Sequence, residues 1–184
     1  MVFGFSKKEF RAVVIILLIL STAVFLNMQT ALRRARDAQR KADIRNIYNA
    51  LVAFQSENGH FPFSENGQII GCGEETDEKG NPIFHACEWG WEGLADLNRV
   101  PGDPLHHSGY RYNYISNGRR YQIFASLESD EEPEYDLKVK ARNLACGEKI
   151  CNFGLGYSNA PLDRTLEQYE AEERKKELEK LNLN

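Results

Sequence analysis

The first strong pattern along the chain is an uninterrupted apolar run near its N-terminus. From Ala12 to Leu32 there is no charged residue, and no Gly or Pro interrupts the run. A helix that crosses a membrane needs about 20 predominantly apolar residues. We therefore expect residues 12–32 to form the transmembrane part of a helix, preceded by a short charged segment at residues 1–11.

Two other interpretations compete with a retained membrane helix. A buried core helix is disfavoured, because the run is apolar on every face and lies at the end of the chain. A cleaved secretory signal peptide stays open, because Lys7, Lys8 and Arg11 precede the run. However, no small-x-small cleavage site follows it. The pattern favours the retained helix.

Beyond the apolar run, residues 33–58 have the pattern of an amphipathic helix. The apolar positions recur at intervals of three and four residues; they are Ile44, Ile47, Tyr48, Leu51 and Phe54. Glu57-Asn58-Gly59 is a helix stop, and Pro62 follows it. We expect one helix from about Phe5 to Asn58, about 80 Å long. Its first half must then be covered by lipid or by neighbouring subunits.

Residues 59–160 are expected to form a small globular head. Asn117-Gly118 is a strong signal for a two-residue hairpin turn. Alternating positions flank it; they are Tyr110, Tyr112, Tyr114, Tyr121, Ile123, Ala125 and Leu127. We interpret residues 64–82 as loop and expect a short helix around residues 91–98. The tyrosine face could stack on bases or sugars, but its alternation favours packing against the long helix.

The last segment, residues 161–184, is expected to be a charged C-terminal helix or tail, helical over 163–181. Glu170 and Arg174 have the spacing of a stabilising pair within a helix. The expected fold class is therefore α+β. A long N-terminal helix, part transmembrane and part amphipathic, packs on a small antiparallel sheet, with disulfide-bonded loops and a C-terminal helix.

The charges are unevenly distributed. The formal net charge is −4, so bulk charge does not indicate a polyanion-binding protein. The stretch from Arg33 to Arg45 is basic and could contact phosphates of nucleic acid or of lipid. Because it directly follows the apolar run, lipid headgroups are the favoured partner.

Two signals in the sequence disagree about the orientation of the helix in the membrane. The cations after Leu32 outnumber those before Ala12, so the positive-inside rule alone places the C-terminal side in the cytoplasm. The four cysteines favour an oxidising compartment for the same side. We adopt the second orientation, with the head outside the cytoplasm.

Four cysteines lie in the expected head, at Cys72, Cys87, Cys146 and Cys151. We expect sequential pairing into two disulfides, although four cysteines allow three connectivities. A four-cysteine zinc site is the alternative, but there is no Cys-x-x-Cys pair to support it.

The histidines offer no recognisable catalytic or metal pattern. His85, His106 and His107 lack the spacing of a metalloprotease motif, and no Gly-x-Ser-x-Gly turn is present. We therefore do not expect an enzyme, and we expect no small-molecule substrate.

Several short motifs follow one another in a fixed order. Gly4-Phe5 comes shortly before Glu9, and the apolar run follows directly. Residues 35–43 are a polar stretch directly after the apolar run, and Glu57 to Pro62 closes the helix. Residues 100–104, 110–114 and 121–128 complete the set. Together these segments resemble type IV pilins and type II secretion pseudopilins, over the first third of the chain and part of the head.

This resemblance implies processing and assembly. It implies cleavage by prepilin peptidase after Gly4, which would make Phe5 the new N-terminus. It also implies that Glu9 pairs with the Phe5 amine of a neighbouring copy. Without that role, Glu9 would be a solvated residue at the membrane interface.

The function implied is that of a structural subunit of a type IV pilus or pseudopilus-like filament. The partners are the membrane, other copies, other pilins and prepilin peptidase. Nucleic acid is a partner only in a DNA-uptake pilus. The location is the cytoplasmic membrane, single-pass, with the head outside the cytoplasm and possible display on a cell-surface filament.

Two departures support an alternative function. Lys7, Lys8 and Arg11 stand where the family has apolar residues, and the family's helix-loosening Gly and Pro are missing. The alternative is a single-pass, membrane-anchored extracytoplasmic binding module that does not polymerise.

One cofactor is suggested by the same resemblance. Some pseudopilins hold calcium in a loop after the hairpin, and here that loop carries Glu128, Asp130, Glu132 and Asp136. Calcium prefers several carboxylate oxygens from one flexible loop. The other interpretation is an exposed acidic turn, and no EF-hand pattern is present.

Overall fold

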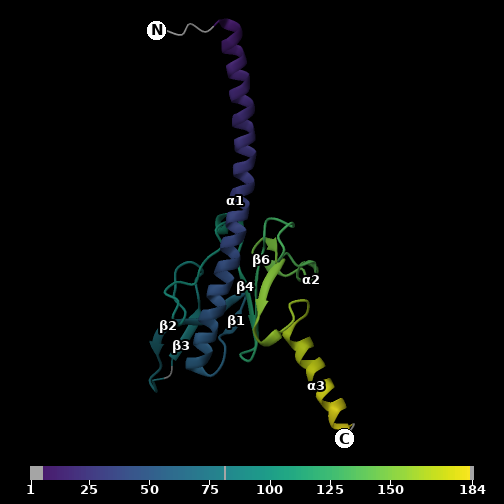
Figure 1. The fold of residues 1–184 in the computed structure, drawn as a ribbon. Helices are drawn as coiled ribbons and strands as arrows, with labels where there is room; N and C mark the ends of the chain where they lie inside the picture. The colour runs from purple at the N-terminus through teal and green to yellow at the C-terminus, as the bar shows by residue number, and fades with distance from the viewer. Residues whose placement is uncertain (1–5, 81, 183–184) are drawn as a thin grey trace.

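The computed structural model describes residues 6–80 and 82–182 and has an α+β architecture. Its dominant element is helix α1 (Lys7–Asn58). Figure 1 shows that the first half of α1 stands alone, whereas the head gathers around its second half. The first turn of α1 and the last described turn of the chain lie at opposite ends of the molecule.

Both ends of α1 are defined by local signals. The Ser6 hydroxyl accepts a hydrogen bond from the Glu9 backbone N–H, and the Glu9 carboxylate accepts one from the Ser6 N–H, which is a capping box. Gly59 ends the helix with φ 77° and donates its N–H to the Gln55 carbonyl. The expected single unbroken helix, ending at Asn58, is confirmed.

The first half of α1 has no cover within the chain. Every described residue from Ser6 to Ala35 is exposed, and Asp37 is the first buried residue of the helix. The helix contains a segment long and apolar enough to cross a membrane, and none of that segment is buried. Exposed apolar surface of this extent requires lipid or protein around it.

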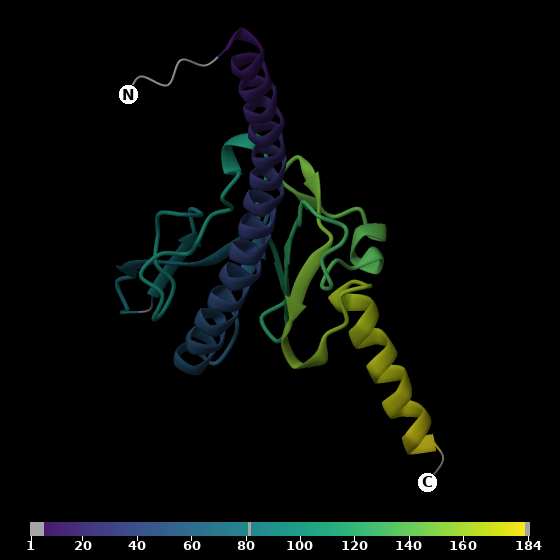
Figure 2. The same cartoon turned by 45° about the horizontal axis from the view of Figure 1, so that its top comes forward.

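The head contains three small antiparallel sheets. The first has the order β1 (Phe63–Glu65), β2 (Gln68–Thr76), β3 (Pro82–Ala86). The second has the order β4 (Asn113–Ser116), β5 (Tyr121–Ala125), β8 (Phe153–Gly156). The third pairs β6 (Ala145–Cys146) with β7 (Lys149–Ile150). In both views the second half of α1 has β2 and β3 on one side and β8 on the other (Figures 1 and 2).

Four helices complete the fold. Two are the short 3-10 helices η1 (His106–Ser108) and η2 (Tyr157–Asn159), and α2 (Leu137–Ala141) is a short α-helix. The last is α3 (Leu166–Asn182), close to the expected 163–181. Figure 2 shows α3 extending away from the head, in the direction opposite to the N-terminal half of α1.

The main core lies between α1 and the second sheet. The fully buried face of α1 includes Ile44, Ile47 and Leu51, and it meets Tyr121 and Ile123 of β5. The Tyr121 ring lies 4.8 Å from Phe61 and 5.9 Å from Tyr48, both edge-on, which is a favourable aromatic geometry. The amphipathic stripe therefore packs on the hairpin, as the pattern predicted.

Two local expectations are wrong. Residues 64–82, interpreted as loop, contain most of the first sheet, and β2 is bulged near Cys72. The short helix expected around residues 91–98 is not formed; Leu94 and Leu97 pair there across a tight turn in which Ala95 has φ 49°. The hairpin at Asn117-Gly118 is confirmed, but its first strand begins at Asn113 and so excludes Tyr110 and Tyr112.

Candidate functional site

The most organised polar site of the described residues joins α1 to the head. We call it the junction cluster; its members are Arg36, Asp37, Arg40, Asp103 and Glu128. Three of these residues come from one helical turn of α1. The other two come from the loop before η1 and from the segment after β5. The cluster therefore lies where the helix enters the head.

Arg40 is the centre of the junction cluster. Its guanidinium Nε and Nη2 donate to the two oxygens of Asp103 at 2.8 and 3.1 Å, and Nη1 donates to Asp37 and Glu128 at 2.8 Å each. The Tyr110 ring covers the guanidinium carbon at 4.6 Å. The Arg40 side chain is 0% exposed. Burial would lower the Arg40 pKa, but the hydrogen bonds to Asp103 and Glu128 raise it overall, so this arginine stays charged.

The carboxylates of the cluster also hold backbone. Asp37 accepts the N–H groups of Glu128 and Ser129 at 2.9 and 3.1 Å. Asp103 accepts the N–H of Leu105 at 2.8 Å. Asp37 thus fixes a head segment against α1, and Asp103 orders its own loop, in addition to pairing with arginine. The described residues contain no buried side-chain nitrogen or oxygen without a hydrogen-bond partner, so the buried charges are fully compensated.

Glu128 links both arginines. It accepts two hydrogen bonds from Arg36, at 2.7 and 2.6 Å, in the two-pronged geometry typical of strong arginine pairs. Burial acts to raise the Glu128 pKa, but the hydrogen bonds from Arg36 and Arg40 outweigh it and lower that pKa. Glu128 is therefore an ionised partner of both Arg36 and Arg40.

A second contact lies one turn further along α1. The Tyr112 hydroxyl donates to Asp43 at 2.8 Å, and both side chains are buried. Burial raises the Asp43 pKa, and the Tyr112 hydrogen bond only partly opposes it. The same burial, together with the Asp43 charge, raises the Tyr112 pKa. The Tyr112–Asp43 hydrogen bond is thus a further buried contact between the head and α1.

The four candidate calcium residues do not converge on one point. Glu128 is paired in the junction cluster, and Glu132 accepts from Lys41 at 2.6 Å. Asp136 caps α2 by accepting the Lys138 N–H, and Asp130 is exposed. Among residues 6–80 and 82–182 no group of His, Cys, Asp and Glu is arranged to hold a metal ion. In this structure the acidic loop pairs with cations of α1.

The basic stretch from Arg33 to Arg45 contains both paired and exposed cations. Arg36, Arg40 and Lys41 pair with acids of the head, which the sequence interpretation did not foresee. Arg33 and Arg34 stay exposed, between the junction cluster and the apolar half of α1. A sequence signal for the buried part existed. Residues 37 and 40 extend the spacing of the apolar stripe onto the same helix face.

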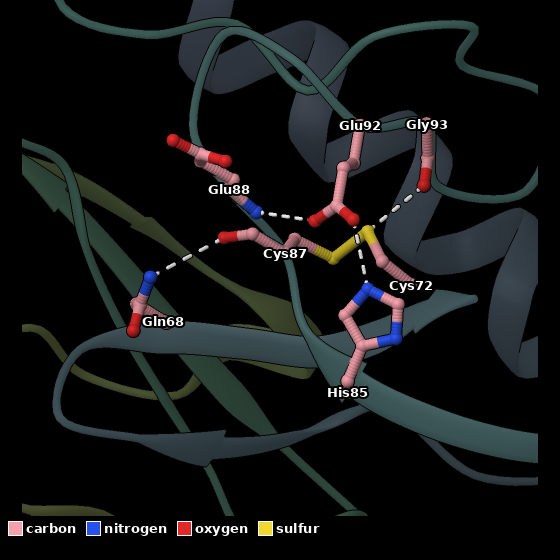
Figure 3. Close-up of a disulfide and its surroundings, with 7 residues drawn as sticks. All are labelled: Gln68, Cys72, His85, Cys87, Glu88, Glu92 and Gly93. Atoms are coloured by element: carbon pink, nitrogen blue, oxygen red, sulfur yellow. Dashed lines mark hydrogen bonds and ion pairs between the residues drawn. A yellow bond between two sulfur atoms is a disulfide. The ribbon is translucent and has the colours of Figure 1, made fainter.

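The cysteines form two buried disulfides, Cys72–Cys87 and Cys146–Cys151, which is the expected sequential pairing. Thiolate ligands for zinc are therefore not present. Figure 3 shows the first disulfide beside a polar bridge: the Glu92 carboxylate contacts the His85 imidazole at 2.8 Å and accepts the Glu88 N–H at 2.7 Å. This arrangement ties β3 to the loop that follows it.

The remaining candidate residues are at the surface or at the N-terminus. His106 and His107 are exposed, with ring centroids 3.6 Å apart. Glu9 lies in the exposed first turn of α1, where its carboxylate caps the helix of its own chain. Gly4 and Phe5, the expected processing residues, lie outside the described residues.

The geometry of the junction cluster supports a structural role. Its charged groups are paired, buried and linked to backbone, and it joins three chain segments. Such an arrangement fixes the head rigidly on the helix.

Compared with known proteins, the chain matches no family model, no curated protein and no solved structure.

Proposed function

We propose that this protein is a structural subunit of a type IV pilus or pseudopilus-like filament, with α1 as its assembly element. The observation that carries the proposal is the continuity of α1. One helix presents an exposed apolar half and then enters the head without a break. Burying such a half between neighbouring helices supplies assembly free energy of about 25 cal/mol per Å².

The junction cluster supports this function more than a simple anchor. A tether needs only a flexible connection between membrane helix and head. A filament needs every head held at the same angle to its helix, because the same contacts repeat between copies. The buried Arg40–Asp103 pair supplies that fixed connection. In this proposal the head lies outside the cytoplasm, where its disulfides are stable.

The experiment is incorporation of Glu9→Ala into filaments sheared from cells. If Glu9 pairs with the N-terminal amine of a neighbouring copy, the variant reaches the membrane in normal amounts but is absent from the sheared fraction. Glu57→Ala is the matched control, since Glu57 is also an exposed α1 glutamate but lies at the far end. Normal incorporation of the Glu9 variant contradicts the assembly role.

One observation favours the second candidate, the membrane-anchored binding module that does not polymerise. The Glu9 carboxylate is already satisfied by the Ser6 N–H of its own chain at 2.7 Å. A Glu9 carboxylate that keeps this partner in its own chain does not need an amine from a neighbouring copy, and Lys7 and Lys8 would then lie beside the headgroups. In that case the protein stays in the membrane fraction, with or without Glu9.

A further inference from the structure

A hollow on the head surface has the size and composition of a small-ligand site. Its volume is about 330 Å³, at the lower end of the range of small-molecule pockets. It lies between the loop after β3 and the segment from Gly102 to Tyr112. Its lining includes Trp89, Trp91 and Tyr110. It is separate from the apolar half of α1, so it does not depend on whether the protein polymerises.

Aromatic side chains form one wall of the hollow. The chain has two tryptophans, and both line it. Trp89 packs edge-on against Tyr112, with ring centroids 5.8 Å apart, so its position is fixed. Trp91 is 74% exposed and leaves its indole uncovered. A flat apolar surface of this kind, open to solvent at the edge of a pocket, favours a ligand that has an apolar face.

Polar side chains with unused hydrogen-bonding capacity lie around the same hollow. Glu88 and Arg111 both line it, and neither side chain has an ion-pair or hydrogen-bond partner within the described part of the chain. Gln68 uses its amide N–H in a long contact to the Cys87 carbonyl, which leaves its oxygen available (Figure 3). One strong acceptor and one strong donor thus face a common space.

The junction cluster holds the hollow in shape. Asp103 lines it and is fixed by Arg40, and the Tyr110 ring is held against the Arg40 guanidinium. The part of the wall formed by Asp103 and Tyr110 is therefore preformed, and a ligand would not have to order it.

We propose that this hollow binds a mono- or disaccharide. A sugar ring has an apolar face that stacks on an indole and hydroxyl groups that both donate and accept hydrogen bonds. It can satisfy Glu88 and Arg111 at once while covering Trp91. Glu88 and Arg111 are both exposed, and a purely apolar ligand would form no hydrogen bond with either of them. A small cation would meet Arg111, and a small anion would meet Glu88, each with repulsion.

The test is titration of the full-length protein with a panel of saccharides. Because both tryptophans line the hollow, intrinsic fluorescence reports binding there directly. The panel contains glucose, galactose, mannose, N-acetylglucosamine and their common disaccharides, up to about 20 mM, since a weak site has millimolar affinity. The detergent is a polyoxyethylene type, because glycoside or choline headgroups would compete. Choline chloride and inorganic phosphate are the charged comparison ligands.

We expect saturable binding of at least one saccharide. Measured by calorimetry, Trp91→Ala and Arg111→Gln should each weaken it by about tenfold or more. Leu137→Ala is the control, since Leu137 is 71% exposed on α2 and does not line the hollow; its affinity should be unchanged. The proposal is overturned if no saccharide binds, if choline or phosphate binds more tightly, or if Trp91→Ala binds normally.

Discussion

Arg40 of α1 donates two hydrogen bonds to the carboxylate of Asp103, which lies 63 residues further along the chain. Both side chains are essentially inaccessible, at 0% and 1% exposure. The pair lies close to the point where α1 leaves the head. The pair fixes the direction of α1 relative to the head, so the helix is not a flexible tether.

The first prediction concerns Arg40. Arg40→Ala leaves the buried Asp37 and Asp103 carboxylates without their cation, so the head should lose about 3–5 kcal/mol of unfolding free energy. Denaturant titration followed by tryptophan fluorescence measures this. Arg45→Ala, an exposed change one turn away on the same helix, should stay within about 0.5 kcal/mol of the parent. Equal effects of the two variants would mean that the junction cluster does not stabilise the head.

The second prediction is a pH dependence with two opposing parts. The Glu128 pKa is lowered in the folded protein, so its contribution to stability is present above the pKa of the unfolded chain. That contribution is lost as the pH falls through the folded pKa. The Asp43 pKa is raised, so the folded state binds the Asp43 proton more strongly, and stability from this residue increases on acidification.

Two variants separate these parts. Asp43→Asn should make the loss of stability on acidification below about pH 5 steeper, because the opposing Asp43 part is removed while Glu128 and the other carboxylates with lowered pKa values, such as Glu92 and Glu134, remain. Glu128→Gln should lower stability at neutral pH and flatten the acid side. Unfolding midpoints measured across the acid range test both slopes. Identical slopes for the parent and Asp43→Asn would rule out a raised Asp43 pKa as a contributor.

The third prediction compares the disulfides. Cys72 and Cys87 are separated by 15 residues and Cys146 and Cys151 by 5. By the chain-entropy relation the first bond stabilises by about 3 kcal/mol and the second by about 2 kcal/mol. Double replacement of each pair by Ser should reproduce that order in denaturant unfolding. The reverse order would show that native-state contacts, rather than loop closure, dominate.

The fourth prediction concerns the membrane segment. Ile19→Arg places a charge within the exposed apolar half of α1 and should disfavour insertion by about 2.5–3.5 kcal/mol. Fractionation of membranes after alkaline washing measures the fraction inserted. Gln29→Arg, near the end of the apolar run, is the control and should insert normally. Full insertion of both variants would argue that this segment is not embedded in lipid.

Local sequence signals were sufficient for several elements. Gly59 marked the end of α1 because a left-handed residue is needed there. Asn117-Gly118 marked the hairpin for a similar reason. Sequential pairing of the cysteines was the expected one of three connectivities that the sequence allowed, and it is the one formed. For Gly59 and Asn117-Gly118 the determining interactions lie within a few residues along the chain.

The missed features depend on distant contacts or on overlooked turns. The first sheet was hidden by glycines and acids in β2, although Asn66-Gly67 is itself a hairpin turn signal between β1 and β2. The junction cluster was missed because Glu128 lies 88 residues from Arg40. Arg40 was interpreted as part of a basic stretch that contacts lipid headgroups, and Glu128 as a candidate calcium ligand or part of an exposed acidic turn. Only tertiary packing brings such charges into the interior.

We propose that α1 is the assembly element of a processed, pilin-like subunit. The mass of the protein recovered from sheared surface filaments tests this, because it identifies the first residue of the chain. We expect filament-borne chains that begin at Phe5, after cleavage behind Gly4. Chains that keep Met1 and occur only in the membrane fraction would contradict it.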